Sequence, residues 1–152
     1  MTKTFEDICK SAEILQQNEN YKAASALFLE ALPLSEKPVE KIYINTSLGK
    51  LFQQNKEVEK SIENFEKALP CFEGFKEQVF SEEQAVIHNN LGALYYEKNL
   101  TSSIENYQKA LDIFNRLRNN SKDQYTAQTG STHFALAYAL VKNRNNQEAK
   151  KH

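Results

Sequence analysis

Apolar and small residues recur along this chain at spacings of three and four, which place them on one face of an α-helix. The segment at 61–69 (SIENFEKAL) returns 42 residues later at 103–111 (SIENYQKAL), with seven of nine positions identical. A related segment precedes each copy, with Leu48-Gly49 in one and Leu91-Gly92 in the other. The pattern therefore predicts a repeated unit of two helices.

The two helices of each repeat carry different patterns of side-chain size. The first helix has a small residue followed three positions later by a large apolar one, and the small residues are Ala12, Gly49, Gly92 and Ala137. The second has a small residue, an aromatic residue four later and an alanine three after that: Ala24/Phe28/Ala31, Ser61/Phe65/Ala68 and Ser103/Tyr107/Ala110. Because glycine inside a helix costs about 1 kcal/mol against alanine, Gly49 and Gly92 predict a helix contact too close for a methyl group.

Capping residues and breakers set the predicted helix boundaries. Thr4–Asp7 and Ser81–Gln84 resemble capping boxes, Pro38 suits a first helical turn, and Pro70 should bend its helix. The predicted helices span about 4–17, 20–35, 38–54, 57–75, 81–98, 101–119 (capped by Thr101) and 121–142 (opened by 121–124). A turn at 143–145 should precede a short last helix that starts near Asn146.

This arrangement resembles the tetratricopeptide repeat, whose signature is W-x2-L-G-x2-Y, then A-x3-F, then Pro. The signature Trp is replaced by Ile8, Asn45, His88 and His133, and Pro33 and Pro70 follow Ala31 and Ala68 by only two residues. The small residues of the first helices are 37, 43 and 45 positions apart (49 − 12, 92 − 49, 137 − 92), against 34 in the common form. The chain is thus similar to the long-repeat branch typified by kinesin light chains and spindle-orientation adaptors.

The resemblance implies an all-α fold, a right-handed superhelical stack of antiparallel helix hairpins (an α-solenoid). The expected organisation is one domain over 1–152, with repeats at about 4–37, 38–79, 81–120 and 121–152, the last of them incomplete. In this family the first helices line a concave groove that binds a peptide or a helix of a partner protein.

We project the groove residues from the stripe opposite the packing face. The candidates are Glu13, Tyr43, Thr46, Lys50, Gln53, Asn89, Asn90, Tyr96, Phe134 and Tyr138. Asn90 is singled out because family members use an asparagine there to hydrogen-bond a ligand's main chain, and an amide both donates and accepts. The alternative for Asn90 is a polar residue facing water, and for the three tyrosines it is packing between repeats.

Composition limits the function classes. The net charge of −1 gives no basic stripe for nucleic acid or for an anionic membrane, and no stretch is apolar enough to span a membrane. The first residues lack the apolar core of a signal peptide, so we predict a cytoplasmic protein whose Cys9 and Cys71 stay reduced.

The sequence offers no grouping of residues for catalysis. Its three histidines are isolated, its four glycines are scattered, and neither cysteine has a metal-ligand spacing to a histidine. We predict no enzyme activity, no metal and no cofactor, and a half-buried structural role for His88 and His133. A chaperone-tail clamp is also excluded, because Glu13 would repel an acidic C-terminus.

Three functions remain open. The first is an adaptor that binds another protein in the groove. The second is self-association through the C-terminal repeat, because its short last helix should leave Phe134 and Leu140 uncovered. The third, suggested by length alone, is a small secretion chaperone.

Overall fold

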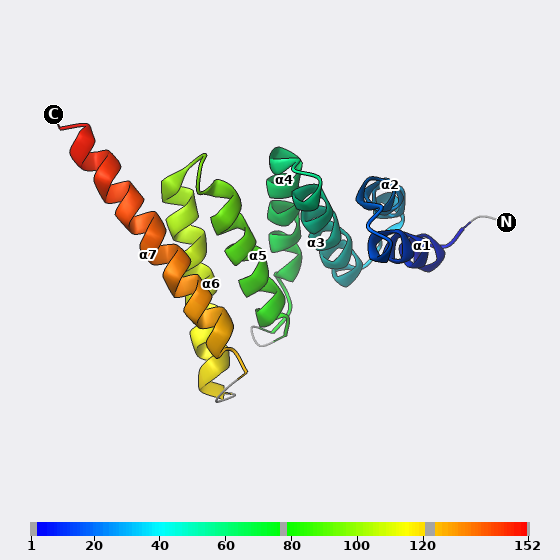
Figure 1. Cartoon of the computed structure of the whole chain (residues 1–152). Helices are drawn as coiled ribbons and strands as arrows, with labels where there is room; N and C mark the ends of the chain where they lie inside the picture. Colours follow the sequence, from blue (N-terminus) through cyan, green and yellow to red (C-terminus); the bar gives the residue numbers. More distant parts are fainter. Residues whose placement is uncertain (1–2, 77–78, 121–123, 152) are drawn as a thin grey trace. The chain divides into compact units, whose positions relative to one another are not determined.

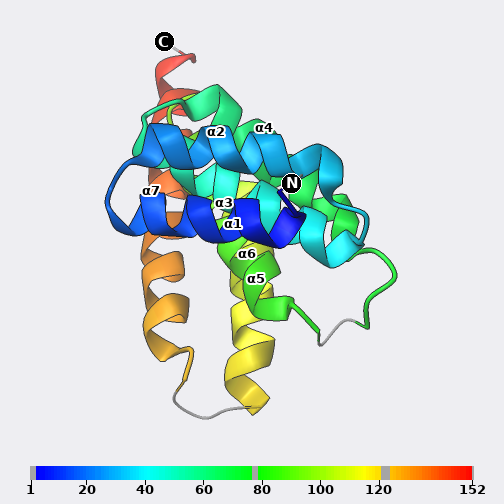
Figure 2. The same ribbon diagram turned by 90° about the vertical axis from the view of Figure 1, so that its right-hand side faces the viewer.

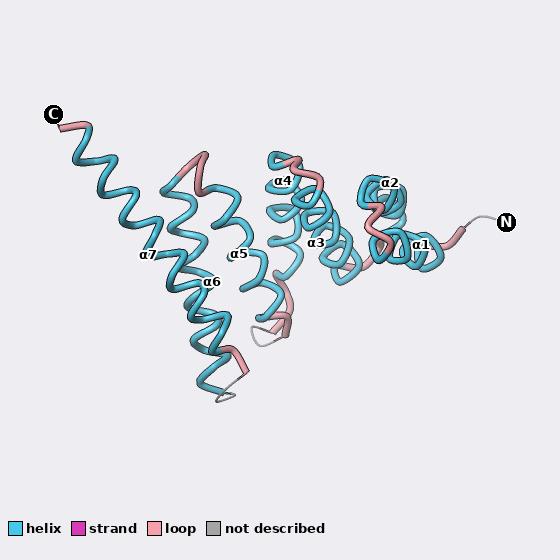
Figure 3. Tube along the Cα trace, in the orientation of Figure 1, coloured by secondary structure: helices cyan, strands magenta, loops and turns pink. Residues whose placement is uncertain are grey.

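The chain is all-α, as predicted. A computed structural model describes residues 3–76, 79–120 and 124–151, and these residues form seven α-helices and two short 3₁₀ turns with no strand (Figures 1 and 3). The chain divides into two compact units, Met1–Phe75 (unit 1) and Lys76–His152 (unit 2). Each unit is a set of packed helices, and the chain as a whole is an all-α helical-repeat protein.

Unit 1 consists of two helix hairpins. The first pairs α1 (Phe5–Gln17) with α2 (Tyr21–Ala31), and the second pairs α3 (Pro38–Gln54) with α4 (Val58–Ala68), while α2 also packs on α3 (Figure 2). The predicted starts are confirmed. Thr4 and Asp7 form a capping box, the Asn20 side chain accepts a hydrogen bond from the N–H of Ala23, and Pro38 occupies the first turn of α3.

Both second helices of unit 1 end earlier than predicted. Helix α2 ends at Ala31 and gives way to a 3₁₀ turn at Leu32–Leu34, and α4 ends at Ala68 before a 3₁₀ turn at Leu69–Phe72. Pro33 and Pro70 lie inside these turns. Proline lacks the N–H for an α-helical bond and its ring clashes with the carbonyl four residues back, so it ends each helix and does not merely bend it.

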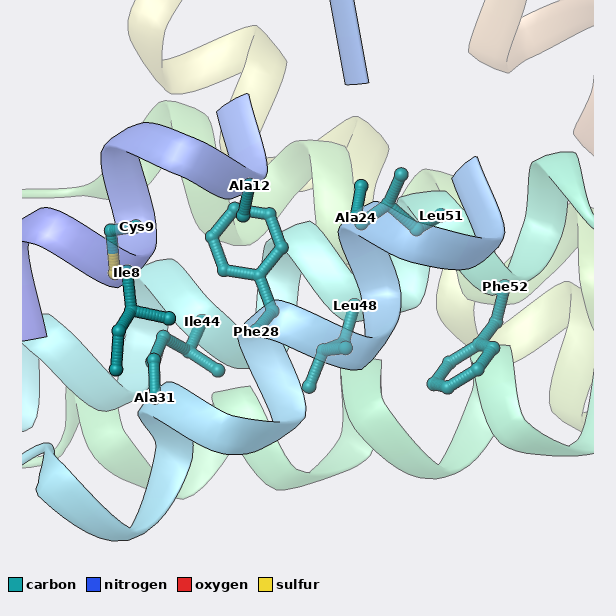
Figure 4. Close-up of a cluster of buried hydrophobic side chains, with 10 residues drawn as sticks. All are labelled: Ile8, Cys9, Ala12, Ala24, Phe28, Ala31, Ile44, Leu48, Leu51 and Phe52. Carbon is teal, nitrogen blue, oxygen red and sulfur yellow. The ribbon is translucent and has the colours of Figure 1, made fainter. Parts of the chain in front are cut away.

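Helices α1, α2 and α3 enclose the core of unit 1. The ring of Phe28 lies next to Ala12 of α1, and both side chains are fully buried (Figure 4). The rest of the cluster is Ile8, Cys9, Ala24, Ala31, Ile44, Leu48, Leu51 and Phe52. Burial of this much apolar surface stabilises unit 1, at roughly 25 cal/mol for each Å² removed from water.

Unit 2 is formed by α5 (Ser81–Tyr95), α6 (Leu100–Asn120) and α7 (Thr126–Ala149), with α6 packed on both neighbours. The capping box predicted at Ser81–Gln84 is wrong. Phe80 is the N-cap of α5, because its carbonyl accepts the first helical hydrogen bond, from the N–H of Gln84. The Phe80 backbone is in the left-handed conformation (φ 65°). Likewise Asn99, and not Thr101, caps α6, since the Asn99 side chain accepts from the N–H of Ser102 (3.1 Å).

Helix α7 is longer than predicted and has no partner hairpin helix in the described chain. The predicted turn at 143–145 is wrong, because α7 continues without a break to Ala149. This segment contains no glycine or proline, and Arg144 and Glu148 form an ion pair one turn apart (3.0 Å). The predicted start of the helix at 121–123 lies outside the described residues.

The close contact predicted at the two helical glycines is confirmed. A Cβ added to Gly49 would lie 2.8 Å from the ring of Phe65, and one added to Gly92 would lie 2.6 Å from the ring of Tyr107. The buried serine of each second helix donates to the glycine's carbonyl, Ser61 to Gly49 at 2.7 Å and Ser103 to Gly92 at 2.6 Å. We call this packing of an aromatic ring on a small residue of the first helix the small–aromatic contact.

Candidate interaction surfaces

In unit 1 the predicted surface residues begin with Glu13 of α1 and Tyr43 of α3. The Tyr43 hydroxyl donates a hydrogen bond to the Glu13 carboxylate, and the Tyr43 ring meets Phe28 edge-on at 5.8 Å. Burial, together with the Glu13 charge, raises the pKa of Tyr43 above its usual range. Tyr43 of α3 therefore packs against α1 and α2, which is the alternative that the sequence left open.

Further along α3, Thr46, Lys50 and Gln53 follow Tyr43 at helical spacings. Lys50 is exposed, whereas Thr46 and Gln53 are half-buried. The Thr46 hydroxyl oxygen is buried and has no hydrogen-bond partner among the described residues. These three side chains share one face of α3 with Tyr43, and their groove role stays a prediction.

The two asparagines of α5 differ in what they contact. The hydroxyl of Thr132 on α7 lies 3.1 Å from Asn89 Oδ1 and 2.8 Å from the carbonyl oxygen of Gln128. Asn89 therefore joins α5 to α7, which gives it a structural contact besides its predicted binding role. Asn90 is half-buried, and its amide makes no hydrogen bond to another described residue.

Aromatic side chains gather on one side of unit 2. The ring of Tyr138 on α7 lies 6.1 Å from that of Tyr96 and 6.3 Å from that of Phe134. Lys142 Nζ lies 4.1 Å from the centre of the Tyr96 ring and 2.9 Å from a carboxylate oxygen of Glu97. We call Tyr96, Phe134 and Tyr138 the aromatic cluster.

Lys142 and Glu97 were missed in the sequence. The hydrogen bond from Lys142 to Glu97 raises the pKa of this lysine, so it carries its positive charge over the Tyr96 ring. Lys142 follows Tyr138 by four residues, and Glu97 follows Tyr96 directly. The helical spacing of Lys142 was a usable signal, but the pairing with Glu97 depends on how α7 crosses the end of α5.

Several apolar side chains of α7 face solvent. Phe134 is 74% exposed, Tyr138 63%, Val141 59% and Leu140 48%. The predicted exposure of Phe134 and Leu140 is confirmed. The cause differs from the predicted short last helix, because α7 continues as a single helix and only its opposite face is buried, against α6 and α5.

The surface of unit 1 has a hollow between the second helices α2 and α4. It encloses about 850 Å³ and is lined by Lys22, Ser25, Leu29, Phe52, Lys60 and Lys67, among others. Lys60 Nζ lies 5.2 Å from the centre of the Phe52 ring. The sequence did not indicate this surface, since the groove was expected on the first helices only.

The histidines divide into one structural residue and one exposed residue. The amide nitrogen of Asn106 donates to the Ser102 carbonyl, which leaves Asn106 Oδ1 to accept from the Nδ1–H of His88 (2.8 Å). Burial lowers the pKa of His88, so the ring is neutral near pH 7. The half-buried role is confirmed for His88 but wrong for His133, which is exposed on α7 because none of the described helices covers that face.

The described residues include no group of three or more potential metal ligands. None of the described helices combines the length and apolar character needed to cross a membrane. Cys9 and Cys71 are both free thiols, as predicted, and burial raises the pKa of Cys9. The surfaces of both units carry aromatic rings, amides and scattered charges.

Comparison with known proteins adds little to this picture. No protein-family model matches the sequence, and no curated protein matches it. One similar solved structure is that of BtubC (BKLC) from P. vanneervenii, with 20% sequence identity and a TM-score of 0.44. The match covers 96% of this chain and 75% of BtubC, and it is too distant for a function to be transferred.

Proposed function

We propose that this chain is a protein-interaction module of the tetratricopeptide type, which binds a peptide or a helix of a partner protein on its first-helix faces. The observation that carries the proposal is the aromatic cluster of unit 2. Its members Phe134 and Tyr138 are well over half exposed, and Tyr96 lies beside them under a positive charge. Exposed aromatic groups of this kind are typical of protein-binding sites.

Asn90 supports the same proposal. Its amide makes no hydrogen bond to the described residues. Asn90 lies on α5, and Tyr96 is the C-cap residue of the same helix. A free amide can pair with both the N–H and the C=O of an extended peptide, so it favours a main-chain ligand. The aromatic cluster would then supply apolar contact area, and Lys142 with Glu97 would add charged groups at the rim.

The experiment is a pull-down from lysate of the source cells, followed by measurement of affinity for the captured partner. The variant Asn90→Ala/Tyr96→Ala should bind the partner at least about tenfold more weakly, which corresponds to one lost hot-spot contact. Asn119→Ala/Glu105→Ala is the matched control, because both side chains are exposed on α6 of the same unit and neither belongs to the aromatic cluster.

Far-UV circular dichroism should show that both double variants remain helical. Equal affinity of the Asn90→Ala/Tyr96→Ala variant and the wild type for every captured partner would remove this face from the proposal.

A further inference from the structure

Helix α7 carries the pattern of a first helix, but its receiving face is uncovered. In sequence register, His133 and Ala137 correspond to Asn45 and Gly49 of α3. Asn45 is 5% exposed and Gly49 lies under the Phe65 ring of the adjacent second helix. On α7 the two equivalent residues are exposed, because no described helix occupies the place that α4 takes on α3.

Helix α7 also carries the pattern of a second helix. Gly130, Phe134 and Ala137 have the spacing of Ser61, Phe65 and Ala68: a small residue, an aromatic four later and an alanine three after that. In the three second helices the aromatic ring is buried against the first helix, with Phe28 and Phe65 at 0% exposure and Tyr107 at 6%. Phe134 is 74% exposed and is the most exposed large apolar residue of the described chain.

We propose that α7 is the interface of a homodimer, in which α7 of one copy packs antiparallel on α7 of a second copy about a twofold axis. A single helix that carries both halves of the small–aromatic contact is self-complementary. Each Phe134 can then pack on the partner's Ala137, and the same contact forms twice, as an isologous interface requires. No other helix of the described chain exposes both patterns on one face.

The register follows from the hairpins of the molecule. In each hairpin the two helices are antiparallel and the ring lies opposite the small residue, as Phe65 does to Gly49. When Phe134 faces the partner's Ala137 in this way, Val141 faces the partner's Gly130. A Cβ at Gly130 would meet no atom within 4 Å, so the space above it is open for the Val141 side chain.

The residue at the centre of the contact need not be glycine. In the first hairpin Ala12 takes the position of Gly49, and Phe28 still packs there with no exposed surface. Ala137 can therefore accept an aromatic ring as Ala12 does. Residues 126–141 of α7 include no Asp, Glu, Lys or Arg, so two copies meet without repulsion between like charges.

The test is sedimentation velocity of the whole chain over a range of concentrations. We expect a monomer–dimer equilibrium with a dissociation constant on the order of 10 μM, because one helix pair buries less area than a standard interface. Ala137→Glu should abolish the dimer by placing two charges under the two rings. Phe134→Ala should weaken it by at least about 30-fold.

Ala26→Glu is the matched control, since Ala26 is an exposed alanine in the middle of α2. It introduces the same charge and should leave the dimer unchanged. All three variants should keep the helical circular dichroism of the wild type, because each changed side chain is exposed. A chain that is monomeric at all concentrations, or a dimer that survives Ala137→Glu, would overturn the proposal.

A disulfide experiment tests the antiparallel register. Gly130→Cys and Val141→Cys are prepared separately in a Cys71→Ser background, in which Cys9 stays buried. Mixing them under oxidising conditions should give a crosslink between the two different variants. Each variant alone should crosslink poorly, because its two cysteines would be about 16 Å apart along the axis at 1.5 Å per residue. The opposite result would indicate parallel helices and overturn the proposed register.

The dimer and the proposed function share Phe134, and Asn90→Ala/Tyr96→Ala separates them, because neither residue lies on α7. This variant should lose partner binding and still form the dimer. If a captured partner instead crosslinks to the stripe of Gly130, Phe134, Ala137 and Val141 while the wild type stays monomeric, the occupant is that partner's helix and the homodimer is excluded.

Discussion

Helices α3 and α7 carry the same first-helix pattern but differ in what covers it. On α3 the face around Gly49 is covered by α4. The Phe65 ring of α4 lies so close that a Cβ added to Gly49 would be 2.8 Å from it. On α7 the equivalent Ala137 is exposed, and Phe134 beside it faces solvent. The comparison shows that the repeat pattern determines which side chains a helix face presents. Whether that face is buried depends on whether another helix packs on it.

The largest expected effect separates the covered phenylalanine from the exposed one. Phe65→Ala should reduce the free energy of unfolding by about 3–5 kcal/mol, because it removes a fully buried ring and leaves a cavity. Phe134→Ala should change it by less than about 0.5 kcal/mol at concentrations where the chain is monomeric. Urea unfolding followed by circular dichroism measures the free energy of unfolding of both variants. Equal losses of stability would show that the Phe134 ring is buried in the monomer.

Two glycine-to-alanine substitutions should change the free energy of unfolding by smaller amounts and in opposite directions. Gly49→Ala should lower the free energy of unfolding by about 1–2 kcal/mol, because overpacking against Phe65 exceeds the gain in helix propensity. Gly130→Ala should raise it by about 0.5–1 kcal/mol, since the added methyl meets no atom within 4 Å. Thermal unfolding of the two variants beside the wild type gives the signs, and a stabilising Gly49→Ala would contradict the close contact.

The smallest effect concerns the pH dependence at His88. Burial lowers its pKa in the folded state, so the unfolded chain binds more protons between that lowered value and the ordinary value of 6.5. This contribution to stability is present above pH 6.5 and is lost as the pH falls toward the folded-state pKa. The covered position of α5 should therefore be acid-sensitive.

The measurement is urea unfolding at pH 7.5 and pH 5.5. His88→Gln should lose less stability on acidification than the wild type. Equal losses in the two proteins would contradict a buried, neutral His88.

Much of the fold could be predicted because its signals are local. Thr4, Asn20 and Pro38 mark helix starts by their own chemistry, and Gly49 indicates a close contact because a helix interior disfavours glycine. The errors arose where two effects compete. The residues around Pro33 and Pro70 favour a helix, but proline cannot continue one. Helices α2 and α4 therefore end at Ala31 and Ala68, earlier than expected.

The candidate site was harder to predict, since it depends on contacts between helices distant in sequence. Tyr43 was recognised as either a surface or a packing residue; its bond to Glu13 gives it a packing contact, and its groove role stays a prediction. The contact of Asn89 with Thr132, and the exposure of His133, follow from the position and the length of α7. Polar residues at 143–146 looked like a turn, but without glycine or proline nothing interrupts the helix.

The serine that accompanies Gly49 and the serine that accompanies Gly92 have a consequence for how this sequence can evolve. Where the first helix has Gly49 or Gly92, the second helix supplies Ser61 or Ser103, whose hydroxyl reaches the glycine's carbonyl. In the first hairpin both positions differ together, with alanine at 12 and at 24. Natural selection should therefore act on the two positions as a pair, so that among descendants of this gene a glycine lost from one helix is followed by the loss of the serine from the other.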